Sequence, residues 1–220
     1  MSAIYDISSY NFFVSLIKII IIMKRTFLFT ALLLFATIGM YAQDARYEIK
    51  SGIIKKSVER GGGTSENITY FDDYGKSEAT NSSFTWEGNT RNMRSISKDG
   101  KSFSLNITDK TYFESNMRTA PINFLKLTQE VKDQYKIKEL GDETVAGKPC
   151  KKYSYEVTMR DNTSTITVWI WKGITLKTAS SFGEWSSTET ATEIQENATV
   201  DATLFAVPSG YTLQERPRPF

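Results

Sequence analysis

The sequence predicts a mainly β protein, built as an antiparallel meander of short strands with one amphipathic helix. Many short runs alternate between apolar and polar residues, as in residues 103–108, where Phe103 and Leu105 alternate with polar side chains. Turn residues separate these runs at near-regular spacing. Apolar residues recur at helical spacing only once, in residues 121–135. Together these observations favour one β domain with a single helical insertion.

The segment 23–42 has the layout of a cleavable secretory signal peptide. Lys24 and Arg25 precede an apolar run, which ends in Tyr41-Ala42-Gln43, so cleavage is expected after Ala42. The alternative is a transmembrane anchor. The apolar run is shorter than the roughly 20 residues that a spanning helix needs, which favours the signal peptide.

Residues 1–22 hold a second apolar run upstream of this signal, interrupted by Lys18. We interpret them as a mis-called upstream start, with translation beginning at Met23. A hairpin of two membrane segments is the alternative, but only Lys24 and Arg25 separate the two runs. The mature protein is then expected to be a single domain, residues 43–220, that does not span the membrane.

Composition excludes several classes of function. The removed part carries three basic residues and one acidic residue, so the totals of 27 and 25 leave the mature chain with no net charge. This argues against a nucleic-acid partner, which requires a basic face. The sequence contains no histidine, which excludes the usual catalytic triads and imidazole zinc sites. Its single cysteine, Cys150, can form no intrachain disulfide, and it lies too far from the cleavage point to carry a lipid. We expect no metal and no cofactor.

The first half reads as a series of hairpins. A strand with a bulge or kink at Gly52 is expected in residues 45–58, and Gly61-Gly62-Gly63 is expected to connect it to the next strand. Asp99-Gly100 is the signature of a tight hairpin turn, because these residues tolerate positive φ angles. Further strands are expected in residues 68–71, 76–86, 90–97 and 103–108.

The helix is expected in residues 121–135. Thr119-Ala120-Pro121 resembles a helix start with proline in the first turn. Phe124, Leu127 and Val131 then fall at helical spacing, followed by Tyr135. This apolar stripe is expected to pack on one face of the sheet.

The stretch 141–183 carries the strongest strand signals. Tyr153 and Tyr155 alternate with polar residues, as expected for a strand with one wet face. The strand at 163–171 has apolar residues on both faces, since Ile166, Val168 and Ile170 alternate with a set that includes Trp169 and Trp171. Such a strand must be covered on both faces or line an apolar hollow. Strands at 174–182 and 185–197 follow, and Leu204 and Phe205 are expected to enter a core.

These features resemble a known group of proteins. The matching residues are the signal ending at Tyr41-Ala42-Gln43, the run from Gly141 to Tyr153, Val168-Trp169, and the ending Phe205…Pro208…Gly210-Tyr211. The chain resembles an exported Bacteroidetes protein of a domain-of-unknown-function family, similar to the lipoprotein-sorting (LolA/LolB-like) half-barrel superfamily. The resemblance implies a strongly curved antiparallel sheet with the helix on its concave side, enclosing an apolar hollow. In relatives of known function, that hollow receives acyl chains of lipoproteins or lipids.

The first functional hypothesis is an exported, periplasmic or secreted protein that binds or carries a lipid or acyl chain. Apolar pockets need little specific chemistry, because burial of methylene groups itself drives binding. The same side chains could instead fill a closed core. The residues expected to line the hollow are Phe103, Leu105, Phe124, Leu127, Val131, Tyr153, Tyr155, Trp169 and Trp171.

The second hypothesis is a non-catalytic module that binds an envelope protein or supports envelope structure. Sheet edges and exposed aromatic residues could pair with such a partner, and the residues expected to be exposed are Tyr70, Phe71, Trp86 and Trp185. An enzyme is not expected. Neighbouring carboxylates such as Asp72 and Asp73 would point to opposite faces of a strand, and Cys150 lacks an imidazole partner.

Overall fold

The computed structural model describes residues 45–61, 63–86, 88–116, 122–159, 162–183 and 185–215. Within them a twelve-stranded sheet has the order β12-β6-β5-β4-β3-β2-β1-β11-β10-β9-β8-β7. Only β12, which pairs with β6, is parallel to its neighbour. The elements are β1 (Gly52–Arg60), β2 (Gly63–Asp72), η1 (Asp73–Gly75), β3 (Ser77–Trp86), β4 (Asn89–Lys98), β5 (Lys101–Asn106), β6 (Thr111–Asn116), α2 (Gln129–Tyr135), β7 (Lys138–Val145), β8 (Lys148–Met159), β9 (Asn162–Trp171), β10 (Ile174–Phe182), β11 (Trp185–Glu196), η2 (Ala202–Phe205) and β12 (Thr212–Leu213).

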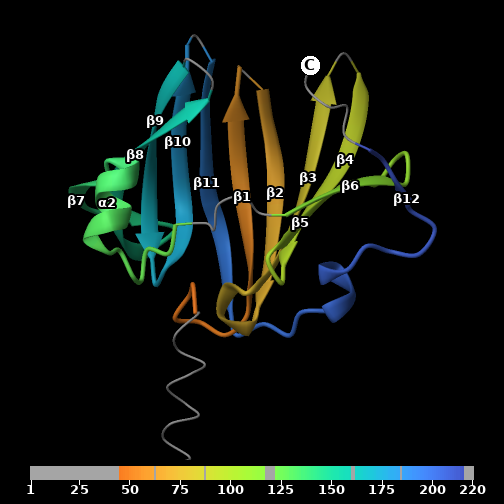
Figure 1. Ribbon diagram of the computed structural model, residues 1–220, viewed down its shortest axis with the longest axis horizontal. Helices are drawn as coiled ribbons and strands as arrows, with labels where there is room; N and C mark the ends of the chain where they lie inside the picture. The colour runs from red at the N-terminus through yellow and green to blue at the C-terminus, as the bar shows by residue number, and fades with distance from the viewer. Residues whose placement is uncertain are drawn as a thin grey trace, which may run out of the picture. The chain divides into compact units, whose positions relative to one another are not determined.

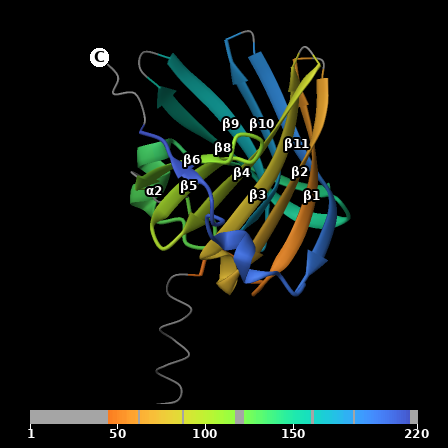
Figure 2. The ribbon, with the colours of Figure 1, turned by 90° about the vertical axis from the view of Figure 1, so that its right-hand side faces the viewer.

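The sheet consists of two meanders joined at its centre. Strands β1 to β6 run outward in one direction, and β7 to β11 run back from the opposite edge until β11 pairs with β1. The edge strands β12 and β7 do not pair with each other, so the sheet curves without closing, as a half-barrel (Figures 1 and 2). The connection from β6 to β7 carries α2, which contacts β8.

Three bulges among the described strands interrupt the register and add local twist. They lie at Lys55/Lys56 in the pairing of β1 with β11, between Thr175 and Lys177 in β10, and between Glu139 and Gly141 in β7. The bulge in β7 lies on an exposed edge strand. Such an irregularity discourages pairing with a further strand.

The predicted hairpins are confirmed where the structure describes them. Lys98 pairs with Lys101 across a two-residue turn, in which Asp99 and Gly100 have φ angles of 51° and 74°. Arg60 pairs with Gly63 across the glycine loop. Positive φ at both turn residues gives a backbone twist that matches the twist of the flanking strands.

The prediction of a strand from residue 45 with a bulge at Gly52 is wrong. The segment 45–50 is irregular, and β1 begins at Gly52. Tyr47 and Ile49 are nevertheless buried, as their alternation suggested. Tyr74 ties this segment to η1, because its carbonyl accepts hydrogen bonds from the amides of Arg46 and Tyr47. The Tyr47 hydroxyl also donates a hydrogen bond to the Glu78 carboxylate.

The predicted helix is shorter than expected. It begins at Gln129, and residues 122–128 form turns instead; Pro121 lies outside the described residues. Asn123 accounts for the difference. Its side-chain oxygen accepts a hydrogen bond from the amide of Leu125, and its amide group donates to the carbonyl of Ala45. Asparagine side chains commonly stabilise turns in this way at the expense of a helix.

Thr128 is the residue that starts the helix. Its backbone is extended and its hydroxyl accepts a hydrogen bond from the amide of Val131, which is the geometry of an N-cap. We expect Thr128→Ala to destabilise α2 by about 1 kcal/mol, while Thr128→Ser retains the cap. Hydrogen exchange of the α2 amides measures this effect. Equal exchange in both variants would contradict the cap.

The C-terminal segment covers one part of the sheet. Phe205 is buried in a cluster with Ala79, Ile96 and Leu105, and η2 contacts β3 and β4. Asp201 caps η2 by accepting a hydrogen bond from the amide of Thr203. The predicted burial of Phe205 is confirmed, and Leu204 packs against the same cluster.

Candidate functional site

The nine residues expected to line one hollow divide among different clusters. Phe124, Leu127, Tyr153 and Tyr155 lie together, with Val168 and Ile170 at the centre of their cluster. Trp169 and Trp171 belong to a second cluster, and Phe103 and Leu105 to a third. Val131 lies half-buried on α2, outside all three.

The first cluster lies where the turn segment 122–127 covers β8 and β9. The ring centroids of Phe124 and Tyr153 are 5.4 Å apart, and those of Phe124 and Tyr155 are 6.5 Å apart. These are contact distances for aromatic pairs. Burial raises the pKa of the Tyr153 and Tyr155 hydroxyls above its usual value. Four of the predicted residues therefore form one apolar group: Tyr153 and Tyr155 come from β8, and Phe124 and Leu127 come from the turn segment rather than from a helix.

Trp169 and Trp171 lie on the opposite face of β9. Trp169 pairs with Lys152, whereas Val168 pairs with Tyr153, and successive residues of a strand face opposite ways. Strand β9 is thus apolar on both faces, as expected. The two tryptophans are only 5% and 7% exposed.

Lysine side chains cover both indole rings. The Nζ atoms of Lys152 and Lys177 lie 4.7 and 4.4 Å from the ring centroid of Trp169. Lys148 and Lys172 lie 4.6 and 4.9 Å from that of Trp171. Lysine stems readily cover apolar surface in this way while the charged groups remain in water.

Each pair of lysines shares one glutamate. Lys148 and Lys172 lie 2.6 and 3.7 Å from the carboxylate of Glu196, and Lys152 and Lys177 lie 3.3 and 3.8 Å from that of Glu143. The nearby indole N–H of Trp169 lowers the pKa of the Glu143 carboxyl more than any other single interaction does. Its geometry nevertheless falls short of a hydrogen bond to any of the described residues. This repeated Lys–Trp–Lys–Glu arrangement accounts for how the second face of β9 is covered.

Phe103 and Leu105 pack under the C-terminal segment rather than under the helical insertion. Leu105 is fully buried. Phe103 and Tyr112 both pack against its cluster, and their ring centroids are 6.5 Å apart. The sequence pattern identified them correctly as apolar and inward-facing. It could not indicate which distant segment covers them.

A cavity of about 430 Å3 opens beside the first cluster. It includes three of the predicted residues, Phe124, Tyr153 and Trp171. Sequence reasoning missed the others, several of which carry charges. Its lining comprises Glu48, Phe124, Leu125, Asp142, Pro149, Cys150, Lys151, Tyr153, Ile170, Trp171, Lys172 and Gly173.

Elements from four parts of the chain position this lining. Glu48 comes from the N-terminal segment, and its backbone amide donates a hydrogen bond to the carbonyl of Lys172. Cys150 is buried, and burial raises the pKa of its thiol. A thiol with a raised pKa is a poor nucleophile, so Cys150 contributes packing at this site.

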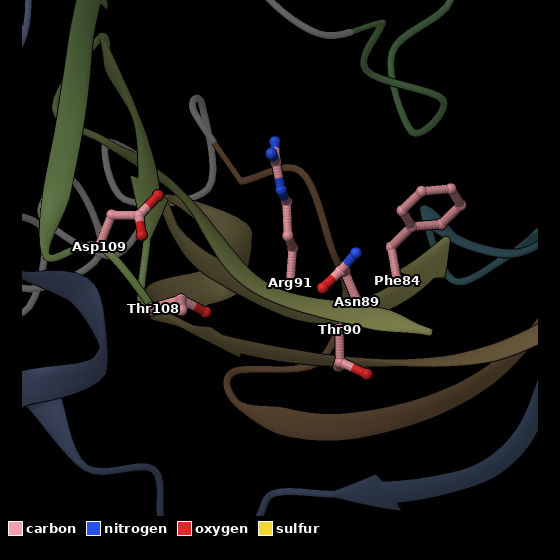
Figure 3. A pocket seen from close by; sticks show the side chains of 6 residues that line it. All are labelled: Phe84, Asn89, Thr90, Arg91, Thr108 and Asp109. Carbon is pink, nitrogen blue, oxygen red and sulfur yellow. The ribbon is translucent and has the colours of Figure 1, made fainter. Parts of the chain in front are cut away.

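A second cavity, of about 550 Å3, lies by the β3–β4 hairpin and the β5–β6 turn. Figure 3 shows Phe84, Asn89 and Arg91 on one side of the hairpin, with Asp109 rising from the neighbouring turn. Apart from Phe84, every lining side chain is polar, so this cavity has fewer apolar lining side chains than the cavity beside Phe124. The lining residues are Phe84, Asn89, Thr90, Arg91, Thr108 and Asp109.

The aromatic residues expected on the surface are only partly exposed. Phe71 is 1% exposed and belongs to the core, so its predicted exposure is wrong. Tyr70 is half-buried against the cluster of Phe205. Trp185 is 65% exposed, as expected, and the side chain of Trp86 lies outside the described part of the chain.

Within the described residues, no group of acidic, cysteine or histidine side chains could hold a metal ion. No helix in the same residues is long and apolar enough to cross a membrane.

The sequence profile of one family, described as a domain of unknown function (DUF4412), matches residues 52–197. The chain belongs to the DUF4412 family. The matched region runs from the start of β1 to the end of β11 and contains most of the cavity beside Phe124. No curated protein shows significant similarity to the sequence.

Solved structures resemble this DUF4412 protein only in fold. An uncharacterised conserved protein from Thermus thermophilus is 8% identical, with a TM-score of 0.51, over 82% of this chain and 99% of its own. MucB of Pseudomonas aeruginosa, in complex with MucA, is 15% identical with a TM-score of 0.45, over 76% of this chain and 58% of its own. The lipoprotein LppX of Mycobacterium tuberculosis is 12% identical with a TM-score of 0.37, over 70% and 91%.

Proposed function

We propose that this DUF4412 protein is exported to the cell envelope, periplasmic or secreted, and there binds or carries an apolar ligand such as a lipid or acyl chain. The observation that carries the proposal is the cavity beside Phe124, Tyr153 and Trp171. Its volume of about 430 Å3 falls within the range of roughly 300–1,000 Å3 typical of small-ligand sites.

Export rests on the layout of the segment 23–42, which is typical of a cleavable signal peptide. The folded unit is compatible with cleavage after Ala42, because it begins at Ala45. Arg46 and Tyr47 are already hydrogen-bonded to Tyr74. Removal of residues before 43 therefore leaves these contacts of the β domain in place.

Binding would be driven by burial of the ligand's methylene groups. Each contributes about 0.8 kcal/mol, so six to eight buried methylenes supply about 5–6 kcal/mol before the costs of association. The apolar wall for such a chain is formed by Phe124, Leu125, Ile170 and Trp171. Titration of the mature protein with a dansyl-labelled fatty acid tests the proposal directly, as does native mass spectrometry of protein purified from its own envelope.

Pro149 offers a way to block the cavity without disturbing the core, because it lines the cavity but is exposed. We expect Pro149→Trp to weaken binding of the fatty-acid probe at least tenfold, since the indole occupies the ligand's place. The matched control is Glu66→Trp on the exposed surface of β2. Retained binding in Pro149→Trp, with an unchanged unfolding midpoint, would show that the probe binds elsewhere.

A protein-interaction role is the second candidate, and the exposure of Trp185 favours it. At 65% exposure this is the most exposed of the large apolar side chains described, and tryptophan is enriched at protein interfaces. This role would be favoured over ligand carriage if the mature protein contains no lipid, does not bind the fatty-acid probe and co-purifies with an envelope protein.

A further inference from the structure

Charged side chains at the cavity beside Phe124 indicate what kind of apolar ligand it accepts. Four of its lining residues are charged: Lys151, Lys172, Glu48 and Asp142. Their formal charges cancel. The lysines form ion pairs with other residues and the two carboxylates do not, and this difference determines which charges a ligand can meet.

Both lysines already have a carboxylate partner, although Glu196, the partner of Lys172, is shared with Lys148. Lys151 Nζ lies 3.2 Å from the carboxylate of Glu139, which is the main cause of its raised pKa. Lys172 Nζ lies 3.7 Å from Glu196 and also over the ring of Trp171. Neither ammonium group is therefore a free anchor for an anionic head group.

The two carboxylates have no comparable partner. Among the described residues, neither Glu48 nor Asp142 forms an ion pair or a side-chain hydrogen bond. Asp142 lies opposite Lys151 in the β7–β8 pairing, but it forms no ion pair with it and raises the pKa of Lys151 less than Glu139 does. Both carboxylates are exposed at the cavity. When the ion-pair partners Lys148, Glu139 and Glu196 are included, three lysines face four carboxylates, so the surplus charge is negative.

The aromatic lining adds to this preference. Phe124, Tyr153 and Trp171 all border the cavity, and the faces of aromatic rings attract cations. The ring of Trp171 already attracts two lysine ammonium groups, at 4.6 and 4.9 Å. Aromatic faces are a recurring feature of sites that bind quaternary ammonium ligands.

We infer that the ligand is an amphiphile whose apolar chain lies against Phe124 and Ile170 and whose head group carries an ammonium group held by Glu48 and Asp142. The inference rests on the proposed function, because it assigns the head group of the same ligand. A primary or quaternary ammonium fits equally, as part of a cationic or a zwitterionic lipid.

The test compares three amphiphiles of one chain length below their micelle concentrations. They are dodecyltrimethylammonium, dodecyldimethylamine oxide without net charge, and dodecanoate, each measured directly by isothermal titration calorimetry. We expect dodecyltrimethylammonium to bind tightest and dodecanoate weakest. The preference should shrink as salt is added, because these charges are exposed.

Neutralising variants then identify the residues. Glu48→Gln and Asp142→Asn should each weaken dodecyltrimethylammonium binding roughly two- to fivefold, as expected for exposed ion pairs. Each should strengthen dodecanoate binding and leave the amine oxide unchanged. Glu66→Gln, an equal charge change on exposed β2, is the control and should change none of the three.

The outcomes separate the two proposals. If neither the probe nor any of the three amphiphiles binds, the proposed function itself fails. If all three bind alike and the variants change nothing, carriage stands and the ammonium preference is overturned. Tighter binding of dodecanoate than of dodecyltrimethylammonium also overturns it. A further experiment covers the zwitterionic case: lysophosphatidylethanolamine should bind more tightly than lysophosphatidate.

Discussion

Phe71→Ala is expected to lower the free energy of unfolding by about 3–5 kcal/mol, the usual cost of deleting a buried phenylalanine. Phe71 is 1% exposed and its ring packs edge-on against Tyr47, with centroids 5.1 Å apart. Gly52 lies directly against the ring, because a Cβ there would come within 2.6 Å of it. Because the residues around Phe71 are packed this closely, they cannot easily move to fill the space that an alanine would leave.

Chemical denaturation with urea measures the effect, and Phe84→Ala is the matched control. Phe84 is 46% exposed, so the same truncation should cost no more than about 1 kcal/mol there. Phe71→Ala should also speed hydrogen exchange at the amides of Arg46 and Tyr47, since these depend on the segment that packs on Phe71. Equal losses in the two variants would mean that Phe71 is not a core residue.

Local sequence patterns predicted the strands and their turns well. Residues 174–182 were expected as a strand and form β10, because the pattern of turn residues and apolar residues there is local. The Asp99-Gly100 turn likewise depends only on its own two residues. Where neighbouring residues determine the backbone, the sequence is sufficient.

Burial without regular structure was harder to predict. Tyr47 and Ile49 alternate with charged residues and are buried, but they lie outside any strand. Their partners are the η1 segment and the β9–β10 turn, through Tyr74 and Lys172. These partners are distant in sequence, so the period alone could not distinguish a buried irregular segment from a strand.

Three of the nine residues predicted to line a hollow border the cavity, whose other lining residues were not predicted. Phe124, Tyr153 and Trp171 were chosen because they are apolar residues at regular spacing, and all three line the same cavity. The lysine stems that cover Trp169 were not foreseen, because a lysine on a strand usually indicates a wet face. The carboxylates Glu48 and Asp142 were missed as well, since only the folded chain brings residues 48 and 142 to the same cavity as Phe124.

Gly173→Ala is expected to lower the free energy of unfolding by at least about 2 kcal/mol, more than positive φ alone would cost. Gly173 follows Lys172 in the two-residue turn between β9 and β10 and has a φ of +81°. A Cβ at this position would lie 2.2 Å from the carbonyl oxygen of Arg46 and 2.9 Å from Leu125. Because the nearest atom belongs to the backbone, the whole N-terminal segment would have to move.

Gly147 provides a control in a turn of the same kind. It follows Ala146 between β7 and β8 with a φ of +73°, and a Cβ there would meet nothing within 4 Å. Gly147→Ala therefore carries only the cost of positive φ, about 1 kcal/mol. The difference between the two variants in urea denaturation measures the contact between Gly173 and the N-terminal segment.

The same substitution links fold stability to the candidate site. Gly173, Leu125 and Glu48 all line the cavity, and the Glu48 amide donates its hydrogen bond to the residue before Gly173. Displacing the N-terminal segment should therefore weaken binding of the fatty-acid probe in Gly173→Ala but not in Gly147→Ala. If both variants lose equal stability and both keep full binding, residues 45–50 play no part in forming the cavity.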